Sequence, residues 1–156
     1  MNLSSRNRKR FAAIAFACML AIPAFAEAYD LDAHLGYYFD SEAIALGFGL
    51  LNGLGDHPRW FFNPNAQAIM GDNRDMIAFN GDFHYDFASS DDLTFWAGGG
   101  PGVYLIDQPG DDNDAELGLN LLAGFGAQQG SVRPFLQGKA IIMDNSEASI
   151  AVGIRF

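Results

Sequence analysis

The stretch "MIAFNGDFHYDF" (residues 76–87) carries the clearest residue pattern in this chain. In an extended strand one face would present bulky apolar side chains, from Ile77, Phe79, Phe83, Tyr85 and Phe87. The opposite face would present small or polar ones, from Ala78, Asn80, Asp82, His84 and Asp86. Because successive side chains of a strand point to opposite sides, this alternation predicts a two-faced β-strand.

Similar alternation recurs over the rest of the chain. The further segments are residues 30–39, 43–51, 60–70, 93–105, 115–128, 132–143 and 146–156. Short clusters rich in Gly, Asp, Asn and Ser separate them, which is typical of turns between strands. No amphipathic helix pattern follows residue 27, so the sequence predicts an all-β chain. Pro64 predicts that segment 60–70 forms an edge, a bulge or a rim of the sheet, because proline cannot donate to a strand ladder.

The composition of the two faces favours one all-β architecture. A soluble sandwich would expose Lys, Glu and Thr on its polar face, whereas here that face carries mostly Gly, Ala, Asp, His and Asn. Bulky apolar residues outside and small or polar residues inside describe a transmembrane barrel, and segments of about ten residues suit a membrane crossing. We therefore predict an eight-stranded antiparallel up-and-down transmembrane β-barrel. A soluble periplasmic barrel that binds a lipid-like ligand against an apolar interior is an alternative.

The first 26 residues resemble a targeting segment. Basic "RNRKR" (6–10) precedes the apolar run "FAAIAFACMLAIPAFA" (11–26), which ends in a small-x-small cleavage pattern. This order predicts a secretory signal peptide over residues 1–26 and a barrel domain over residues 27–156. Lipoprotein processing at Cys18 is a weaker alternative, because Ala15 stands where leucine is expected.

Removal of the signal peptide would change both the charge and the redox chemistry. The remaining residues include five basic and 19 acidic side chains, a formal charge of −14. This charge argues against a nucleic-acid partner. The only cysteine would leave with the signal peptide, so no disulfide is expected.

Charged residues on the inward face predict one ion pair. Lys139 and Arg155 are the inward-facing cations identified by the alternation. The last strand must pair with the first to close the barrel, which would bring Arg155 level with Asp30 and Asp32. Because an unpaired charge inside the barrel would be costly, we predict an ion pair between Arg155 and these aspartates.

Other polar clusters have both a chemical and a structural interpretation. Asp82-x-His84-x-Asp86 and Asp30-x-Asp32-x-His34 could hold a metal or relay a proton, but a hydrated polar network is favoured in so narrow a barrel. In the acidic stretch "DQPGDDNDAE", the weak calcium candidates are Asp111, Asp112 and Asp114, and a solvated loop is favoured. We therefore expect no metal and no cofactor.

The sequence predicts no catalytic site. Ser89 and Ser90 fall in a predicted inner turn, and Ser149 has no histidine near it in sequence. The aromatic residues are instead candidates for girdles at the membrane interfaces, except Trp96, which falls on the inward face as a space filler. The girdle candidates are Tyr37, Tyr38, Trp60, Phe61, Phe62 and Tyr104.

The chain resembles the small eight-stranded outer-membrane β-barrel proteins of Gram-negative bacteria, the OmpX-like and OmpA-barrel-like group. The resemblance rests on "FWAGGGPGVYL", "GLNLLAGFGAQ", "RPFLQGKA" and "ASIAVGIRF", which closes on an aromatic residue. It implies an outer-membrane monomer in contact with lipid and lipopolysaccharide, with a structural or surface-interaction role. It also implies that Phe156, with Ile154 and Val152, forms the signal read by the barrel-assembly machinery. A narrow cation or solute pore is the alternative role.

Overall fold

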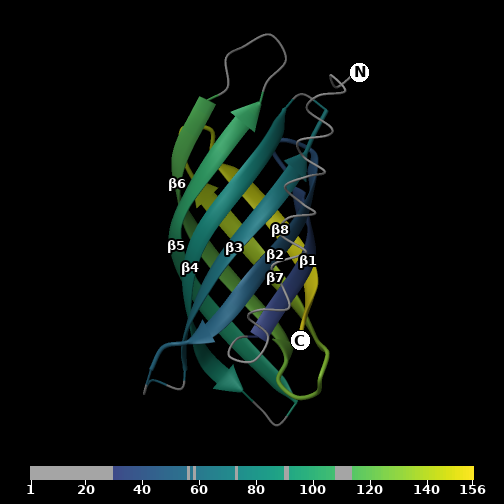
Figure 1. Cartoon of the computed structure of the whole chain (residues 1–156), viewed down its shortest axis with the longest axis vertical. Coiled ribbons are helices and arrows are strands. Elements are labelled where there is room, and N and C mark those ends of the chain that lie inside the picture. The colour runs from purple at the N-terminus through teal and green to yellow at the C-terminus, as the bar shows by residue number, and fades with distance from the viewer. Residues whose placement is uncertain (1–29, 56, 58, 73, 90–91, 108–113) are drawn as a thin grey trace.

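The strands close into a single barrel in which each strand pairs with its neighbours in chain order (Figure 1). This computed structural model describes residues 30–156, apart from 56, 58, 73, 90–91 and 108–113. The strands are β1 (Asp30–Tyr38), β2 (Ala43–Gly53), β3 (Trp60–Met70), β4 (Asp75–Ser89), β5 (Leu93–Asp107), β6 (Asp114–Ala127), β7 (Arg133–Ile142) and β8 (Glu147–Arg155). Their bounds differ from the predicted segments by at most two residues. The predicted eight-stranded antiparallel barrel is confirmed. Within the described residues, no helix is long and apolar enough to cross a membrane.

The last strand closes the barrel against the first. β8 pairs with β1 in antiparallel register from Asp32↔Arg155 to Tyr38↔Ser149. The ladder continues beyond β8, because the Phe156 N–H donates to the Leu31 carbonyl at 2.9 Å. We call the end of the barrel where β1 begins and β8 ends the terminal end, and the opposite end the loop end. The C-terminus marks the terminal end in Figure 1.

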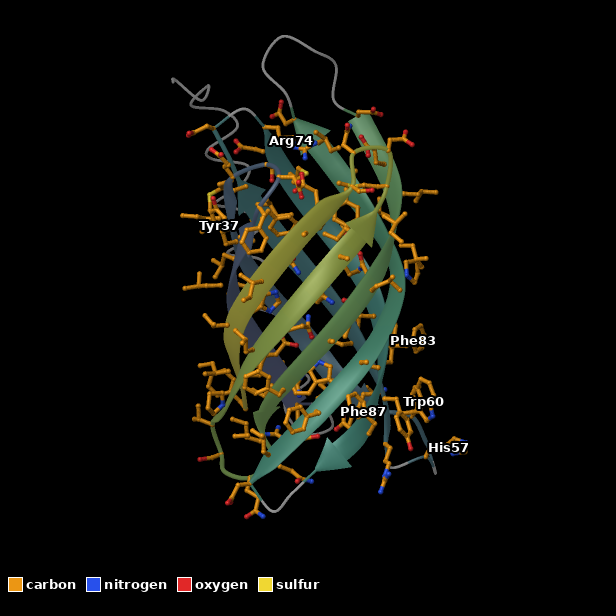
Figure 2. All side chains as sticks on the ribbon, turned by 180° about the vertical axis from the view of Figure 1, so that it is seen from behind. Tyr37, His57, Trp60, Arg74, Phe83 and Phe87 are labelled. Carbon is orange, nitrogen blue, oxygen red and sulfur yellow. The ribbon has the colours of Figure 1, made fainter. Side chains whose placement is uncertain are left out.

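The two faces of the strands point as the alternation predicts. Leu117 on β6 is 79% exposed and Leu35 on β1 is 57% exposed, whereas Trp96 on β5 is fully buried inside. Figure 2 shows Trp60 and Phe83 projecting away from the barrel wall, and Tyr37 and Phe87 are 40% and 54% exposed. The outer surface is therefore an apolar belt of the kind that faces lipid tails. The soluble alternative, with an apolar interior and a polar exterior, is wrong because it requires the opposite orientation.

Pro64 does not place its strand at an edge or a rim. It lies in the middle of β3, opposite Gly81 of β4, and the strand is paired on both sides. On the β2 side the ladder is interrupted where Pro64 has no N–H to donate. The side-chain amide of Asn63 donates to the Leu50 carbonyl at 3.3 Å, which gives that carbonyl a substitute donor. The prediction of an edge, bulge or rim is wrong because a neighbouring side chain compensates for the proline.

Glycines on β5 allow the backbones of β4 and β5 to come very close. A Cβ on Gly98 would lie 1.9 Å from the Phe83 carbonyl oxygen, and one on Gly100 would lie 1.9 Å from the Gly81 carbonyl oxygen. The contact atoms belong to backbone, so they cannot move aside as a side chain would. The glycine run in "GGGPG" is therefore a requirement of strand packing.

We expect Gly100→Ala to destabilise the folded barrel by about 1–3 kcal/mol, the usual cost of forcing extra atoms into a packed site. The measurement is the urea midpoint at which the compact, fast-migrating band is lost on a gel of unboiled protein. Gly138→Ala is the matched control, because a Cβ there would meet its nearest atom only at 4.0 Å. Equal midpoints for the two variants would contradict the packing argument.

Candidate functional site

The candidate site is the interior of the barrel, because the alternation directs the polar side chains there. It is built in layers from the terminal end to the loop end. These are an aromatic layer, a polar layer, an apolar layer and an ion pair at the loop end.

The aromatic layer lies nearest the terminal end. Phe61 stacks on the His84 ring at 5.4 Å, and Trp96 contacts both His84 at 5.8 Å and Phe135 at 6.2 Å between ring centroids. The guanidinium carbon of Arg155 lies 4.2 Å from the Trp96 centroid and 4.9 Å from that of Phe135. These are cation–π distances, so the buried guanidinium is stabilised by ring faces.

The polar layer is organised around the buried carboxylate of Asp82. Lys139 Nζ lies 2.7 Å from Asp82 Oδ2 and forms an ion pair with it. Asn65 Nδ2 donates to Oδ2 at 3.0 Å, and Asn120 Nδ2 donates to Oδ1 at 2.8 Å. Asp82, Lys139 and Asn120 are all buried. Both oxygens of this carboxylate are therefore bonded, as a buried charge requires.

Amide side chains extend this network across the interior. Asn80 Nδ2 donates to Asn65 Oδ1 at 2.9 Å, and the Tyr104 hydroxyl lies 2.7 Å from Asn120 Oδ1. The network also reaches β1, where Asn63 Nδ2 from β3 donates to Asp32 Oδ2 at 2.6 Å. The network therefore connects strands on opposite walls of the barrel.

An apolar layer fills the interior closer to the loop end. Its larger buried members come from five different strands and pack into one cluster. They are Tyr38, Ile69, Met76, Tyr104, Ile106 and Ile141. The hydroxyl of Tyr38 donates to Gln67 Oε1 at 2.7 Å, so the ring joins the apolar layer to the polar one. This layer leaves water little room between the polar network and the outside.

An ion pair lies over the apolar layer at the loop end. Arg74, in the turn between β3 and β4, pairs with Glu147 at the start of β8. Figure 2 labels Arg74 at this end of the barrel. The Glu147 side chain is buried, and its Oε2 also accepts a hydrogen bond from the Ser41 N–H at 3.2 Å. The pair joins segments far apart in the sequence and closes the mouth of the barrel.

The predicted ion pair of Arg155 is not formed as expected. The register does place Arg155 opposite Asp32, but Asp30 pairs instead with Arg133, whose Nη2 lies 2.6 Å from Asp30 Oδ2. Among the described residues, no carboxylate oxygen lies within 4.0 Å of the Arg155 guanidinium, which rests on Trp96. The reason is competition, because Asp32 is already bonded to His34 and Asn63.

Arg133 is the functional residue that the sequence analysis missed. It begins β7 and shares the parity of Phe135, Gln137 and Lys139, so it belongs to the inward face. The statement that Lys139 and Arg155 are the inward cations is therefore incomplete. The alternation itself contained the signal, because Arg133 lies two residues before Phe135 in the predicted segment 132–143.

The two His–Asp clusters both reach the same small cavity. Asp32 Oδ1 lies 2.9 Å from His34 Nδ1, and Asp86 Oδ1 lies 3.7 Å from His84 Nε2. His34 and His84 line one cavity of about 10 Å³. Within the described residues, no group of three His, Cys, Asp or Glu side chains could hold a metal ion. His34 is joined through Asp32 and Asn63 to the interior polar network.

The weak calcium candidates are described only in part. Asp111 and Asp112 lie outside the described residues, as does the predicted signal peptide over residues 1–26. Asp114 is exposed at the start of β6, and its Oδ1 accepts a hydrogen bond from the Ala115 N–H at 2.8 Å.

Only part of the predicted girdle faces outward. Trp60 contacts Tyr85 at 5.2 Å between centroids, and Tyr37 contacts Phe39 at 5.4 Å, both on the outer surface. Tyr38 and Tyr104 are buried inside, and Phe61 stacks on buried His84. The prediction that these three residues belong to an outer girdle is therefore wrong. Their parity places them on the inward face, and parity outweighs the general preference of aromatic residues for interfaces.

Comparison with solved structures gives a consistent assignment of the fold. The N-terminal β-barrel domain of Pseudomonas aeruginosa OprF aligns with a TM-score of 0.62 and 17% identity, over 82% of this chain and 96% of that one. The fold is that of the small outer-membrane β-barrels. Ail, the attachment invasion locus protein of Yersinia pestis, aligns with a TM-score of 0.53 and 11% identity, over 82% and 97% of the chains.

The same barrel carries different functions in its structural neighbours. The outer membrane enzyme PagL aligns with a TM-score of 0.52 and 14% identity, over 81% of this chain and 98% of that one. A de novo designed transmembrane β-barrel aligns with a TM-score of 0.55 and 17% identity, over 83% and 94%. No family model and no curated protein sequence matches this chain. At these identities the neighbours share the fold alone.

Proposed function

We propose that this chain is a closed, non-conducting and non-catalytic monomeric barrel of the outer membrane, with a structural or surface-interaction role. The observation that carries the proposal is the filled interior. A fully bonded Asp82, an apolar cluster and an ion pair at the loop end succeed one another along the axis. In this proposal the terminal end faces the periplasm. β1 begins and β8 ends at this end, and an even number of strands puts both ends of an outer-membrane barrel on the periplasmic side.

The interior argues against the pore alternative. A conducting path needs continuous water, whereas the cavity of about 10 Å³ has room for about one water molecule. Ile69, Ile106 and Ile141 lie between that cavity and the loop end. Ions would have to displace both this apolar layer and the Arg74–Glu147 pair.

We expect no unitary current steps when the purified, folded barrel is inserted into planar lipid bilayers. The experiment uses protein whose compact band on an unboiled gel proves folding, with a known porin as the positive control. Steps of constant size that scale with salt concentration would contradict the closed-barrel proposal and favour the cation or solute pore.

The histidines give no support to a catalytic role. His34 and His84 are buried inside the barrel, and His57 is exposed in the turn between β2 and β3 at the terminal end. Among the described residues, no Ser or Thr hydroxyl donates to a histidine ring. A hydroxyl nucleophile needs such a base within hydrogen-bonding distance. The enzyme PagL shows that this fold can carry catalysis, so the proposal rests on the residues of this chain.

Outer-membrane lipid and lipopolysaccharide are the proposed surroundings, and the barrel-assembly machinery is the proposed partner during insertion. The proposed recognition element is the outward face of β8, with Val152, Ile154 and Phe156. Each of these side chains is exposed on the outer surface. A signal on the closing strand would be available until that strand pairs with β1.

We expect Phe156→Ala to lower the amount of folded protein recovered in the outer membrane of living cells, because the assembly signal is weakened. Folding of the purified variant into lipid vesicles should change little. Phe87→Ala is the matched control, since Phe87 is 54% exposed and Phe156 is 52% exposed. If both variants assembled as well as the parent chain, Phe156 would not be a signal.

A further inference from the structure

We propose that the interior contains a built site for a single water molecule, held between His84 on β4 and Arg155 on β8. This inference does not depend on the proposed function. It rests on two buried polar atoms, on the cavity that both side chains line, and on the chemistry of the surrounding groups.

Among the side chains that the structure describes, two buried nitrogens lack a hydrogen-bond partner on the protein. They are His84 Nε2 and Arg155 Nε. The residues are 2% and 7% exposed, so bulk water does not satisfy them. Leaving such a group unbonded costs about 1–3 kcal/mol, and buried polar atoms are nearly always bonded in folded proteins. Each nitrogen therefore needs a hydrogen-bond partner that the protein does not supply.

The position of the two side chains offers one place for that ligand. His84 and Arg155 line the same cavity, whose volume is about 10 Å³. This is about the space that one water molecule needs. Asp86 Oδ1 is also unpartnered and lies 3.7 Å from His84 Nε2, too far for a direct hydrogen bond.

The chemistry of the cavity favours water over an ion. Arg155 supplies an N–H donor, and the imidazole nitrogen of His84 can donate or accept. A halide would lie in a cavity that the Asp32 carboxylate also lines, and a metal cation would face the Arg155 guanidinium. Water both donates and accepts, so it satisfies the two nitrogens without adding charge.

The water would connect the strand that closes the barrel to the opposite wall. Arg155 is the last residue of β8, and its ring contacts with Trp96 leave Nε without a protein acceptor. A water on Nε and on His84 Nε2 joins β8 to β4, which are not neighbours in the barrel. The site thus completes the hydrogen bonding of the aromatic layer.

The test is a high-resolution crystal structure of the full barrel in detergent, together with water–protein magnetisation transfer by NMR. We expect one ordered water within hydrogen-bonding distance of Arg155 Nε and His84 Nε2, and a cross-peak from a long-lived water to the Arg155 Nε proton. A direct bond from Arg155 Nε to a carboxylate, or no water at this position, would overturn the proposal.

Two further arms separate the alternatives. A bromide soak should leave no anomalous peak in the cavity, and a peak there would make it an anion site instead. His84→Phe keeps the ring stack but removes the ligand atom, so the cross-peak should disappear. His57→Phe is the control, because His57 is exposed outside the cavity and its loss should leave the signal intact. Persistence of the signal in His84→Phe would exclude His84 as a ligand.

Discussion

Lys139→Met is expected to lower the free energy of unfolding by about 3–5 kcal/mol, because it leaves a buried carboxylate without its cation. Asp82 is 2% exposed, and Lys139 Nζ is its ion-pair partner at 2.7 Å. Methionine preserves much of the side-chain length, so the effect would come mainly from the charge. The measurement is the urea midpoint of the compact band in lipid or detergent.

The matched variant removes both charges together. In Asp82→Asn/Lys139→Met the amide oxygen at position 82 can still accept from Asn120, and neither position carries a charge. Replacing both members of a buried pair is often nearly neutral, so we expect the double variant to recover most of the lost stability. A double variant as unstable as Lys139→Met alone would show that the ion pair is not the cause.

Leu121→Arg is expected to cost about 2–4 kcal/mol, the usual penalty for a cation on the lipid face near the middle of the bilayer. Leu121 lies in the middle of β6 and is 50% exposed on the outer surface. In water an exposed leucine could be replaced with little effect. This penalty therefore tests directly whether the apolar belt faces lipid.

The same substitution nearer the loop end is the control. Leu117 lies on the same strand and the same face, and it is 79% exposed. Leu117→Arg should cost only about 0–1 kcal/mol, because the charge can reach the interface. Equal effects of the two substitutions on the folding free energy in lipid vesicles would contradict the proposed depth of the belt.

The fold was predictable from sequence because each strand carries its own information. The two-residue period of segments such as 76–87 fixes which side chains point inward without reference to any other strand. Tyr38 and Tyr104 illustrate the strength of this rule. Their position in the alternation correctly places them inside the barrel, whereas the general preference of tyrosine for membrane interfaces would place them outside.

The contacts inside the barrel were less predictable because they depend on height along the axis. Parity places Asp30, Arg133 and Arg155 inside, but the tilt and stagger of the strands determine which of them meet. Arg133 therefore takes the aspartate that was expected for Arg155. For the same reason, no local pattern indicates that Asp82 and Lys139 come together from β4 and β7.

The side-chain network also determines how the barrel comes apart. Backbone ladders join each strand only to its neighbours, and an assembly with such contacts alone can lose its strands one at a time. Here Asp82–Lys139 joins β4 to β7, Asn63–Asp32 joins β3 to β1, and Arg74–Glu147 reaches from the β3–β4 turn to β8. If the strands on one side of the barrel detach, the side chains on the opposite side lose their hydrogen-bond and ion-pair partners. We therefore expect the barrel to unfold as one cooperative unit, with no stable half-open form between the closed state and the unfolded chain.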